Sequence, residues 1–260
     1  MGWNRTSGVL IGGFFLLLFL IGYIWWPLAA EYVASYNPAY PWWAQVDWLL
    51  IGIFLAMSLL ITSGPDLRKD VPILLVGLAG GTVIETWGTQ SGLWAYYTGE
   101  APPLWILPAW PVASLAIERI TRLLNRRVRP GAGRGTDLLY AAVFGLFILL
   151  MVFFVRPALG AEHPLSWAAL GLCVFLIFTQ RDRRGALVIF GAGILLGYFL
   201  ERWGTTRECW VYYTRQTPPF FAVLAHGMAA VAFERSKQAL GLVLQVVFGR
   251  LNRRARAAGW

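Results

Sequence analysis

Eight apolar runs constrain this chain more than any other feature of its sequence. Each is close to the roughly 17–25 residues that an α-helix needs to cross a bilayer, and no hydrophilic stretch between them is long enough for a separate soluble domain. Only 13% of the residues are charged, against about 25% in a typical soluble domain. We therefore predict an all-α integral membrane protein with about eight transmembrane helices, near 8–26, 47–63, 71–87, 104–121, 137–156, 165–180, 185–202 and 219–236.

The placement of the basic residues predicts the orientation of these helices. If the amino terminus is cytoplasmic, 18 of the 22 Lys and Arg residues fall on the cytoplasmic side, as the positive-inside rule requires. Both termini are then cytoplasmic, and the net charge of +9 reflects topology and contact with lipid headgroups, not nucleic-acid binding. We expect the protein in the cytoplasmic membrane of a bacterium or archaeon. The first run also has the form of a signal peptide, but Trp25 and Trp26 after it favour an interface anchor.

An internal repeat relates the two halves of the chain. A shift of 116 residues superimposes 85–119 on 201–235 without a gap, with identical residues at fifteen of the 35 positions. An even number of helices in each unit gives both units the same orientation, so we predict two parallel four-helix repeats. The predicted parts are a first repeat over 1–122, a cytoplasmic linker over 123–136, a second repeat over 137–236 and a basic amphipathic segment over 237–260, which lies as a helix on the membrane surface.

Within the repeat, an acidic residue near the end of an apolar run precedes a cluster of aromatic residues. Glu85 and Glu201 are costly in such a position unless they are paired, hydrated or turned into the bundle. One interpretation is structural: each carboxylate anchors a loop or the other repeat, and the aromatic residues are an interface belt. The other is catalytic: a desolvated carboxyl group donates a proton to an alkene, and aromatic faces stabilise the carbocation. The predicted pocket residues are Trp87, Trp94, Tyr96, Tyr97, Trp110, Trp203, Trp210, Tyr212 and Tyr213.

The two halves differ at positions that bear on this chemistry. Arg202 follows Glu201, whereas Thr86 follows Glu85, so Glu85 is the better proton donor and Glu201 an anchor or charge stabiliser. His226 replaces Trp110 and is either a proton relay or a hydrogen-bonded core residue.

Other polar residues have structural interpretations. Asp66 and Asp182 are expected as loop charges or helix caps, and Glu118-Arg119 and Glu234-Arg235 as ion pairs at helix ends. Two Cys and two His at unrelated positions predict no metal site, and the chemistry needs no organic cofactor.

The segment "IETWGTQSGLWAYYTGEAPPLWILPAWPVASLAIER" resembles the signature of the carotenoid biosynthesis membrane family that includes the carotenoid hydratases. The matching positions are Glu85, Gly88, Gly92, Trp94, Tyr96, Pro102, Pro108 and Trp110. A more general similarity is to small integral-membrane terpene cyclases, which also protonate with a carboxylate. Both resemblances imply a polyprenyl or carotenoid substrate that enters from the lipid.

The leading hypothesis is a membrane enzyme of isoprenoid metabolism that protonates a polyprenyl double bond, followed by hydration or cyclisation. Glu85, Glu201 and His226 are its candidate catalytic residues. One alternative is a non-catalytic membrane scaffold or a pigment- or lipid-binding subunit with membrane-protein partners. Another is a transporter of a small solute through the cleft between the repeats.

Overall fold

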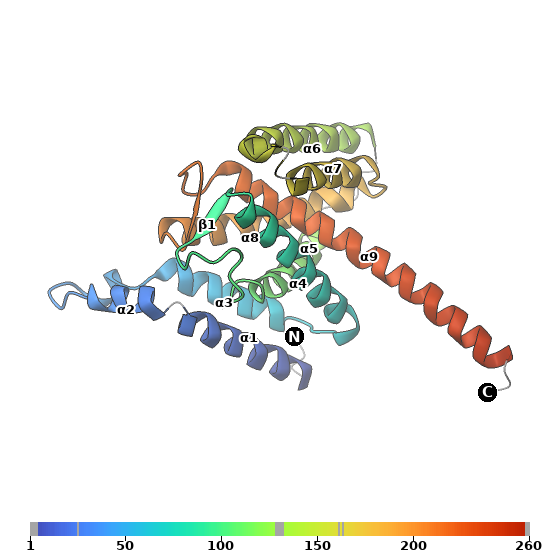
Figure 1. Cartoon of the computed structure of the whole chain (residues 1–260). Helices are drawn as coiled ribbons and strands as arrows, with labels where there is room; N and C mark the ends of the chain where they lie inside the picture. The colour runs from blue at the N-terminus through green and yellow to red at the C-terminus, as the bar shows by residue number, and fades with distance from the viewer. Residues whose placement is uncertain (1–4, 25, 128–132, 161, 163, 258–260) are drawn as a thin grey trace.

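The computed structural model describes residues 5–24, 26–127, 133–160, 162 and 164–257, with backbone alone for Ile24, Leu28 and 242–257. The protein is mostly helical (Figure 1). In the first half the helices are α1 (Arg5–Ile24), α2 (Trp26–Ala34), α3 (Trp48–Thr62), α4 (Leu67–Gln90) and α5 (Ala109–Arg127). In the second half they are α6 (Arg134–Val155), α7 (Pro164–Phe178), α8 (Arg183–Thr206) and α9 (Phe220–Ala257). Two short 3₁₀ turns cover Trp42–Ala44 and Arg156–Ala158.

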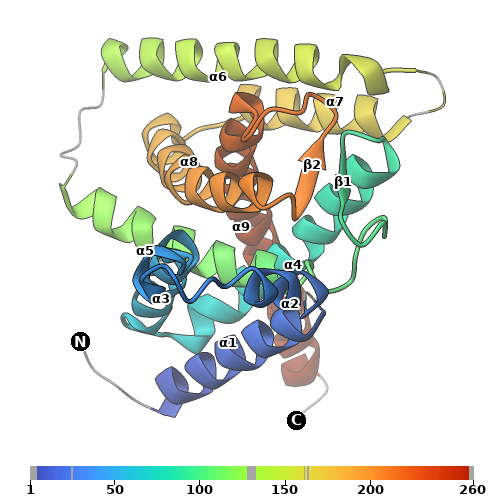
Figure 2. The same cartoon turned by 90° about the vertical axis from the view of Figure 1, so that its left-hand side faces the viewer.

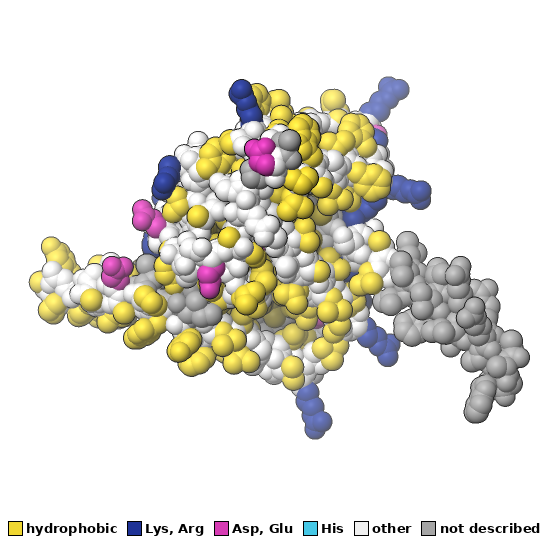
Figure 3. Space-filling model, in the orientation of Figure 1, with side chains coloured by type: hydrophobic (Ala, Val, Ile, Leu, Met, Phe, Trp, Pro, Cys, Tyr) yellow, Lys and Arg dark blue, Asp and Glu magenta, His cyan; other side chains and the backbone are white. Residues whose placement is uncertain are grey.

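Each of the eight predicted apolar segments coincides largely with one of these helices. Among the described residues, four helical segments are long and apolar enough to cross a membrane: Arg5–Tyr23, Leu67–Gln90, Arg134–Ala158 and Arg183–Thr206. The apolar helices α3 and α7 are shorter, at 15 residues each. Hydrophobic side chains spread over the visible surface (Figure 3), as expected for helices that face lipid. The helical fold and its membrane character are therefore confirmed, while the count of eight spans stays a prediction.

Three predicted boundaries lie inside helices, and the one at 136/137 lies within α6, which begins at Arg134. The boundary at 122/123 lies within α5, and that at 236/237 lies within α9, which runs without a break to Ala257. Figure 1 shows the carboxyl-terminal part of α9 extending beyond the rest of the molecule.

Equivalent helices begin and end at equivalent residues when the chain is shifted by 116. This holds for α3 and α7 and for α4 and α8. Asp66 caps α4 by accepting from the Arg68 N–H, and Asp182 caps α8 by accepting from the Gly185 N–H. An acidic side chain at this position satisfies a free N–H and complements the helix dipole, so the predicted capping is confirmed.

A two-stranded sheet, absent from our sequence-based expectations, joins the two halves. β1 (Trp94–Tyr96) pairs antiparallel with β2 (Trp210–Tyr212), with Trp94 opposite Tyr212 and Tyr96 opposite Trp210. Each strand starts four residues after the end of α4 or α8. The sheet therefore brings the carboxyl-terminal ends of these two helices to the same end of the molecule.

The outer helices of the two halves pack differently. α6 packs against α7, α8 and α9, and its Phe144, Phe147 and Met151 belong to the largest hydrophobic core cluster. α1 packs mainly against α3, and Phe14 is its buried contribution to a second cluster. Figure 2 shows these two helices on opposite sides of the molecule, with α8, α9 and the sheet between them.

Candidate functional site

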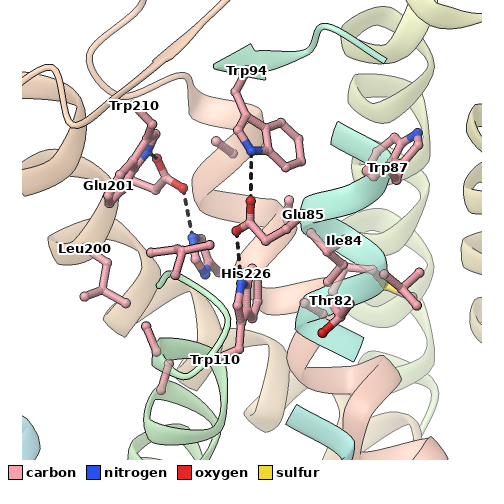
Figure 4. A pocket seen from close by; sticks show the side chains of 18 of the residues that line it. Thr82, Ile84, Glu85, Trp87, Trp94, Trp110, Leu200, Glu201, Trp210 and His226 are labelled. Atoms are coloured by element: carbon pink, nitrogen blue, oxygen red, sulfur yellow. Dashed lines mark hydrogen bonds and ion pairs between the residues drawn. The ribbon is translucent and has the colours of Figure 1, made fainter. Parts of the chain in front are cut away.

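A cavity of about 630 Å³ lies between the two halves and contains both predicted carboxylates on its wall. Residues from α1 and α3 form one end of its lining, and residues from α6 and α7 form the other. Glu85 on α4 and Glu201 on α8 line the middle, together with the aromatic residues of the repeat (Figure 4). The lining is almost entirely apolar, which suits a lipid-soluble ligand.

Three donors from its own half hold the buried Glu85. Its Oε2 accepts from Trp94 Nε1 at 3.1 Å and from the Tyr96 hydroxyl at 2.9 Å. Its Oε1 accepts from Trp110 Nε1 at 3.0 Å. A carboxylate so buried is tolerated because hydrogen bonds replace its lost hydration.

Glu201 has an equivalent indole and phenol, but its third partner and the sharing of its two oxygens differ from those of Glu85. Trp210 Nε1 lies 2.9 Å from Oε2, and the Tyr212 hydroxyl lies 2.8 Å from Oε1. His226 Nε2 takes the place of the Trp110 indole, at 2.9 Å from Oε1.

The turns between helix and strand explain why the indoles reach back to the carboxylates. Gly92 adopts the left-handed conformation with φ +66°, which glycine enters without steric cost, so the chain reverses after α4. A Cβ on Gly88 would overlap the Trp94 ring, and one on Gly204 would overlap the Trp210 ring. The two glycines therefore let each indole lie directly on the helix that carries its carboxylate.

The sheet register places aromatic residues of one half against those of the other. The ring centroids of Trp94 and Tyr212 are 5.8 Å apart, and those of Tyr96 and Trp210 are 6.0 Å apart. Burial raises the pKa of both Tyr96 and Tyr212 well above the usual range, and the neighbouring carboxylates act in the same direction. Both hydroxyls therefore remain protonated donors at any physiological pH.

The third donors of the two halves contact each other across the cavity wall. The Trp110 and His226 rings are stacked, with centroids 5.7 Å apart and planes 18° from parallel. Gly81 and Gly197 leave the space for them, since a Cβ at either position would overlap Trp110 or His226. One continuous layer thus runs from Glu85 through Trp110 and His226 to Glu201.

Most of the predicted site residues meet at this cavity. Ten line it: Glu85, Trp87, Trp94, Tyr96, Trp110, Glu201, Trp203, Trp210, Tyr212 and His226. Tyr97 and Tyr213 are not among the described lining residues; both side chains are partly exposed, and Tyr213 donates to the Phe154 carbonyl at 2.7 Å. Side chains alternate along a strand, so the residue after Tyr96 or Tyr212 points away.

Arg202 does not play the part that we expected from its position beside Glu201. We expected Arg202 to favour the charged form of Glu201, but Arg202 donates to the Thr217 carbonyl at 3.0 Å, while the partners of Glu201 are Trp210, Tyr212 and His226. The difference between the two carboxylates therefore lies in Trp110 and His226.

Two features escaped the sequence reasoning. Trp105, a buried lining residue, packs edge-on against Tyr96 with centroids 5.4 Å apart; its place after the Pro pair was a usable signal. Asp70, fully buried in the first turn of α4, forms an ion pair with the buried Arg119 at 2.7 Å. Arg119 also pairs with Glu118 as expected, but inside α5 and not at a helix end. The expected pairing of Glu234 with Arg235 is wrong, since Glu234 lies inside α9 and pairs with Lys237.

Among the described residues, no group of three or more His, Cys, Asp or Glu side chains lies close enough together to hold a metal ion. Searches against protein-family models, curated proteins and solved structures found no match to this chain.

Proposed function

We propose that this protein is an integral membrane enzyme of isoprenoid metabolism, which protonates a carbon–carbon double bond of a polyprenyl or carotenoid substrate. The observation that carries the proposal is the pair of buried carboxylates in one apolar cavity walled by indole and phenol rings. The carboxylates supply the acid, and the aromatic faces supply cation–π stabilisation for a carbocation.

The proposed topology follows from the same geometry. We take the chain to be a duplicated four-helix unit in the cytoplasmic membrane, with both units in the same orientation and both termini cytoplasmic. Support comes from α4 and α8, whose carboxyl-terminal ends meet at one sheet, and from the distribution of basic residues. We propose that substrate enters this cavity from the lipid, the phase in which such substrates dissolve.

In the proposed reaction, Glu85 acts first as the acid. Its Oε1 receives one hydrogen bond and its Oε2 receives two, so Oε1 is the better site for the proton. The O–H bond breaks, the π electrons of the alkene form a new C–H bond, and a carbocation remains. Trp94, Tyr96 and Trp110 then stabilise the carboxylate that is left, as preorganised donors do for a developing anion. Water or a second double bond of the substrate captures the cation.

The test is Glu85→Gln in the full-length protein, produced in cells that make lycopene. Glutamine keeps the shape but cannot donate an acidic proton, so we expect product to fall by about 10²-fold or more. Glu100→Gln, at an exposed position beyond β1, is the matched control and should leave the yield unchanged. Equal product from wild type and Glu85→Gln, both correctly inserted, would contradict the assignment.

One observation favours a second candidate, a pigment- or lipid-binding subunit without turnover. Each carboxylate has three hydrogen-bond partners, which is also how a structural anchor is satisfied. Purification distinguishes the two functions: a binding subunit retains unchanged lycopene in wild type and in Glu85→Gln, whereas the enzyme releases a modified product in wild type alone.

A further inference from the structure

The two carboxylates of the cavity differ in one partner that can exchange protons. Trp110 and His226 occupy the same place in the two halves, at 3.0 Å and 2.9 Å from their carboxylates. An indole N–H is a donor only, whereas an imidazole nitrogen both donates and accepts. The Glu85 cluster therefore has no second group that takes up a proton, but the Glu201 cluster has.

Several polar groups that line the cavity already have partners within the protein. Buried water typically makes about three hydrogen bonds to polar groups that lack other partners. Thr82 donates to the Leu78 carbonyl, Trp87 to Ser166, and Trp203 to Asp47. The donors on Glu85 and Glu201 are likewise engaged. A cation formed in this cavity faces aromatic rings and the second carboxylate.

We propose that the Glu201–His226 pair is the base that ends the reaction, so that the product is an isomer of the substrate and not a hydrate. The inference rests on the proposed function and assigns its second step. The pair removes a proton from a carbon next to the cation, and the electrons of that C–H bond form a new C=C bond. One proton leaves Glu85 and one arrives at Glu201–His226, so the step needs no water, oxidant or reductant.

His226 makes the pair a base because the arriving proton is shared. The 2.9 Å separation between Nε2 and Oε1 lets the imidazole and the carboxylate hold one proton between them, with the positive ring beside the negative carboxylate. Exchange with solvent then returns the site to its starting state. The first half of the chain thus supplies the acid, and the second half supplies the base.

The experiment uses purified full-length protein in lipid vesicles loaded with lycopene, with reactions in ordinary water, in ²H₂O and in H₂¹⁸O. We expect a product of unchanged mass in ordinary water, one deuterium for each double bond that reacts in ²H₂O, and no ¹⁸O. The variants are His226→Gln and His226→Trp, the latter copying the first half. Both should reduce turnover by about 10²-fold while lycopene binding stays within about twofold of wild type.

Trp110→His is the reciprocal variant, since it adds an imidazole beside Glu85 and leaves the Glu201 and His226 side chains themselves unchanged. It should retain more turnover than His226→Trp, although both exchange one ring for the other. Retained lycopene binding shows that each variant is folded. If the larger indole of His226→Trp disturbs the packing against Gly197, His226→Gln still tests the role of His226.

Each outcome decides between the claims. A product containing ¹⁸O overturns proton loss but leaves the proposed enzyme standing, with hydration as its reaction. An isomeric product formed by both His226 variants at the rate of wild type overturns the role of His226. No product from wild type overturns this inference and the proposed function together.

Discussion

The carboxylate clusters of the two halves share the same frame and differ in their surroundings. Each has a glutamate on a long helix, an indole and a phenol from the following strand, and a third donor from the next helix. The first half completes the set with Trp110 and the second with His226. The antiparallel sheet places an equivalent indole and phenol at each carboxylate. The chemistry of the two halves differs at the third partner, which is Trp110 in one and His226 in the other.

The halves also differ away from the cavity. The first half buries an ion pair between Asp70 and Arg119, whereas Ala186 stands at the position of Asp70 in the second half, and Arg235 donates instead to the Thr179 carbonyl at 3.1 Å. The outer helix α1 packs mainly against α3, whereas α6 is embedded among α7, α8 and α9. The same unit is thus stabilised by a buried charge pair in one copy and by aliphatic and aromatic packing in the other.

The largest effect should come from breaking the charge pair. Arg119→Met leaves Asp70 buried without its cation, which typically costs about 3–5 kcal/mol. Arg235→Met, at the equivalent position, loses hydrogen bonds to a loop and should cost about 1 kcal/mol. Thermal unfolding in detergent measures both, and equal losses would remove the distinction between the halves.

A double variant separates charge burial from packing. Asp70→Ala combined with Arg119→Met removes both charges and places at position 70 the alanine that the second half has at 186. It should recover much of the stability lost in Arg119→Met, because no buried charge is then left unpaired. No recovery would show that Arg119 acts through the packing of its side chain.

A smaller effect, equal in the two halves, is expected at the glycines beneath the indoles. Gly88→Ala and Gly204→Ala would each force an indole away from its carboxylate, and such overpacking costs about 1–3 kcal/mol. Gly52→Ala and Gly145→Ala are matched controls in helices α3 and α6, where a Cβ meets nothing within 4 Å. These should be neutral or stabilising by up to about 1 kcal/mol. Tolerance at Gly88 with sensitivity at Gly204 would break the equivalence of the two clusters.

The eight apolar segments were predictable because hydropathy depends on local composition. The repeat was predictable because identical residues recur at a fixed offset in the sequence. The pairing of Glu85 with Trp94 and Tyr96 followed in part from their proximity in the chain. The sheet was not predicted, since three-residue strands carry almost no periodic signal and the paired residues lie 114 to 118 positions apart in the chain.

Other parts of the site depended on contacts between distant segments. The proximity of Trp110 to His226 requires α5 and α9 to meet, which no local pattern encodes. From the sequence, Asp70 is indistinguishable from any acidic residue in the first turn of a helix. The only sign of a special role is that the equivalent position in the second half is Ala186. The wrong inference about Arg202 has the same origin, because neighbours in sequence on a helix point in different directions.

The stability of the folded protein should fall modestly as the solution becomes alkaline. The folded-state pKa of Tyr96 and Tyr212 is raised by burial, while an unfolded tyrosine has a pKa of about 10. Their contribution to stability is therefore complete below about pH 10 and is lost as the pH rises above that value. In the double variant Tyr96→Phe and Tyr212→Phe, the alkaline decline should be shallower than in wild type. The exposed Tyr36→Phe is the control, and an unchanged slope in the double variant would contradict the assignment.

The smallest effect is expected at Cys209, which stands where the first half has Leu93. Burial raises the pKa of the Cys209 thiol to about 12, and only the thiolate reacts readily. In a Cys173→Ala background, a maleimide at pH 8 should label unfolded but not folded protein. Leu93→Cys should be protected to the same extent, and Cys209→Leu should change stability by less than about 1.5 kcal/mol. Rapid labelling of only one of the two positions in folded protein would show that the equivalent positions 93 and 209 are not equally protected from solvent.

The central claim is that both carboxylates face one shared cavity, and the stoichiometry of lycopene binding to purified protein tests it most directly. Ala113 and Ala229 are equivalent positions that line the cavity from α5 and α9, so Ala113→Phe and Ala229→Phe each fill it from a different half. A shared cavity predicts one lycopene per chain in wild type and loss of binding in either variant alone. Two lycopenes per chain in wild type, with each variant losing one of them, would show two separate niches and contradict the account.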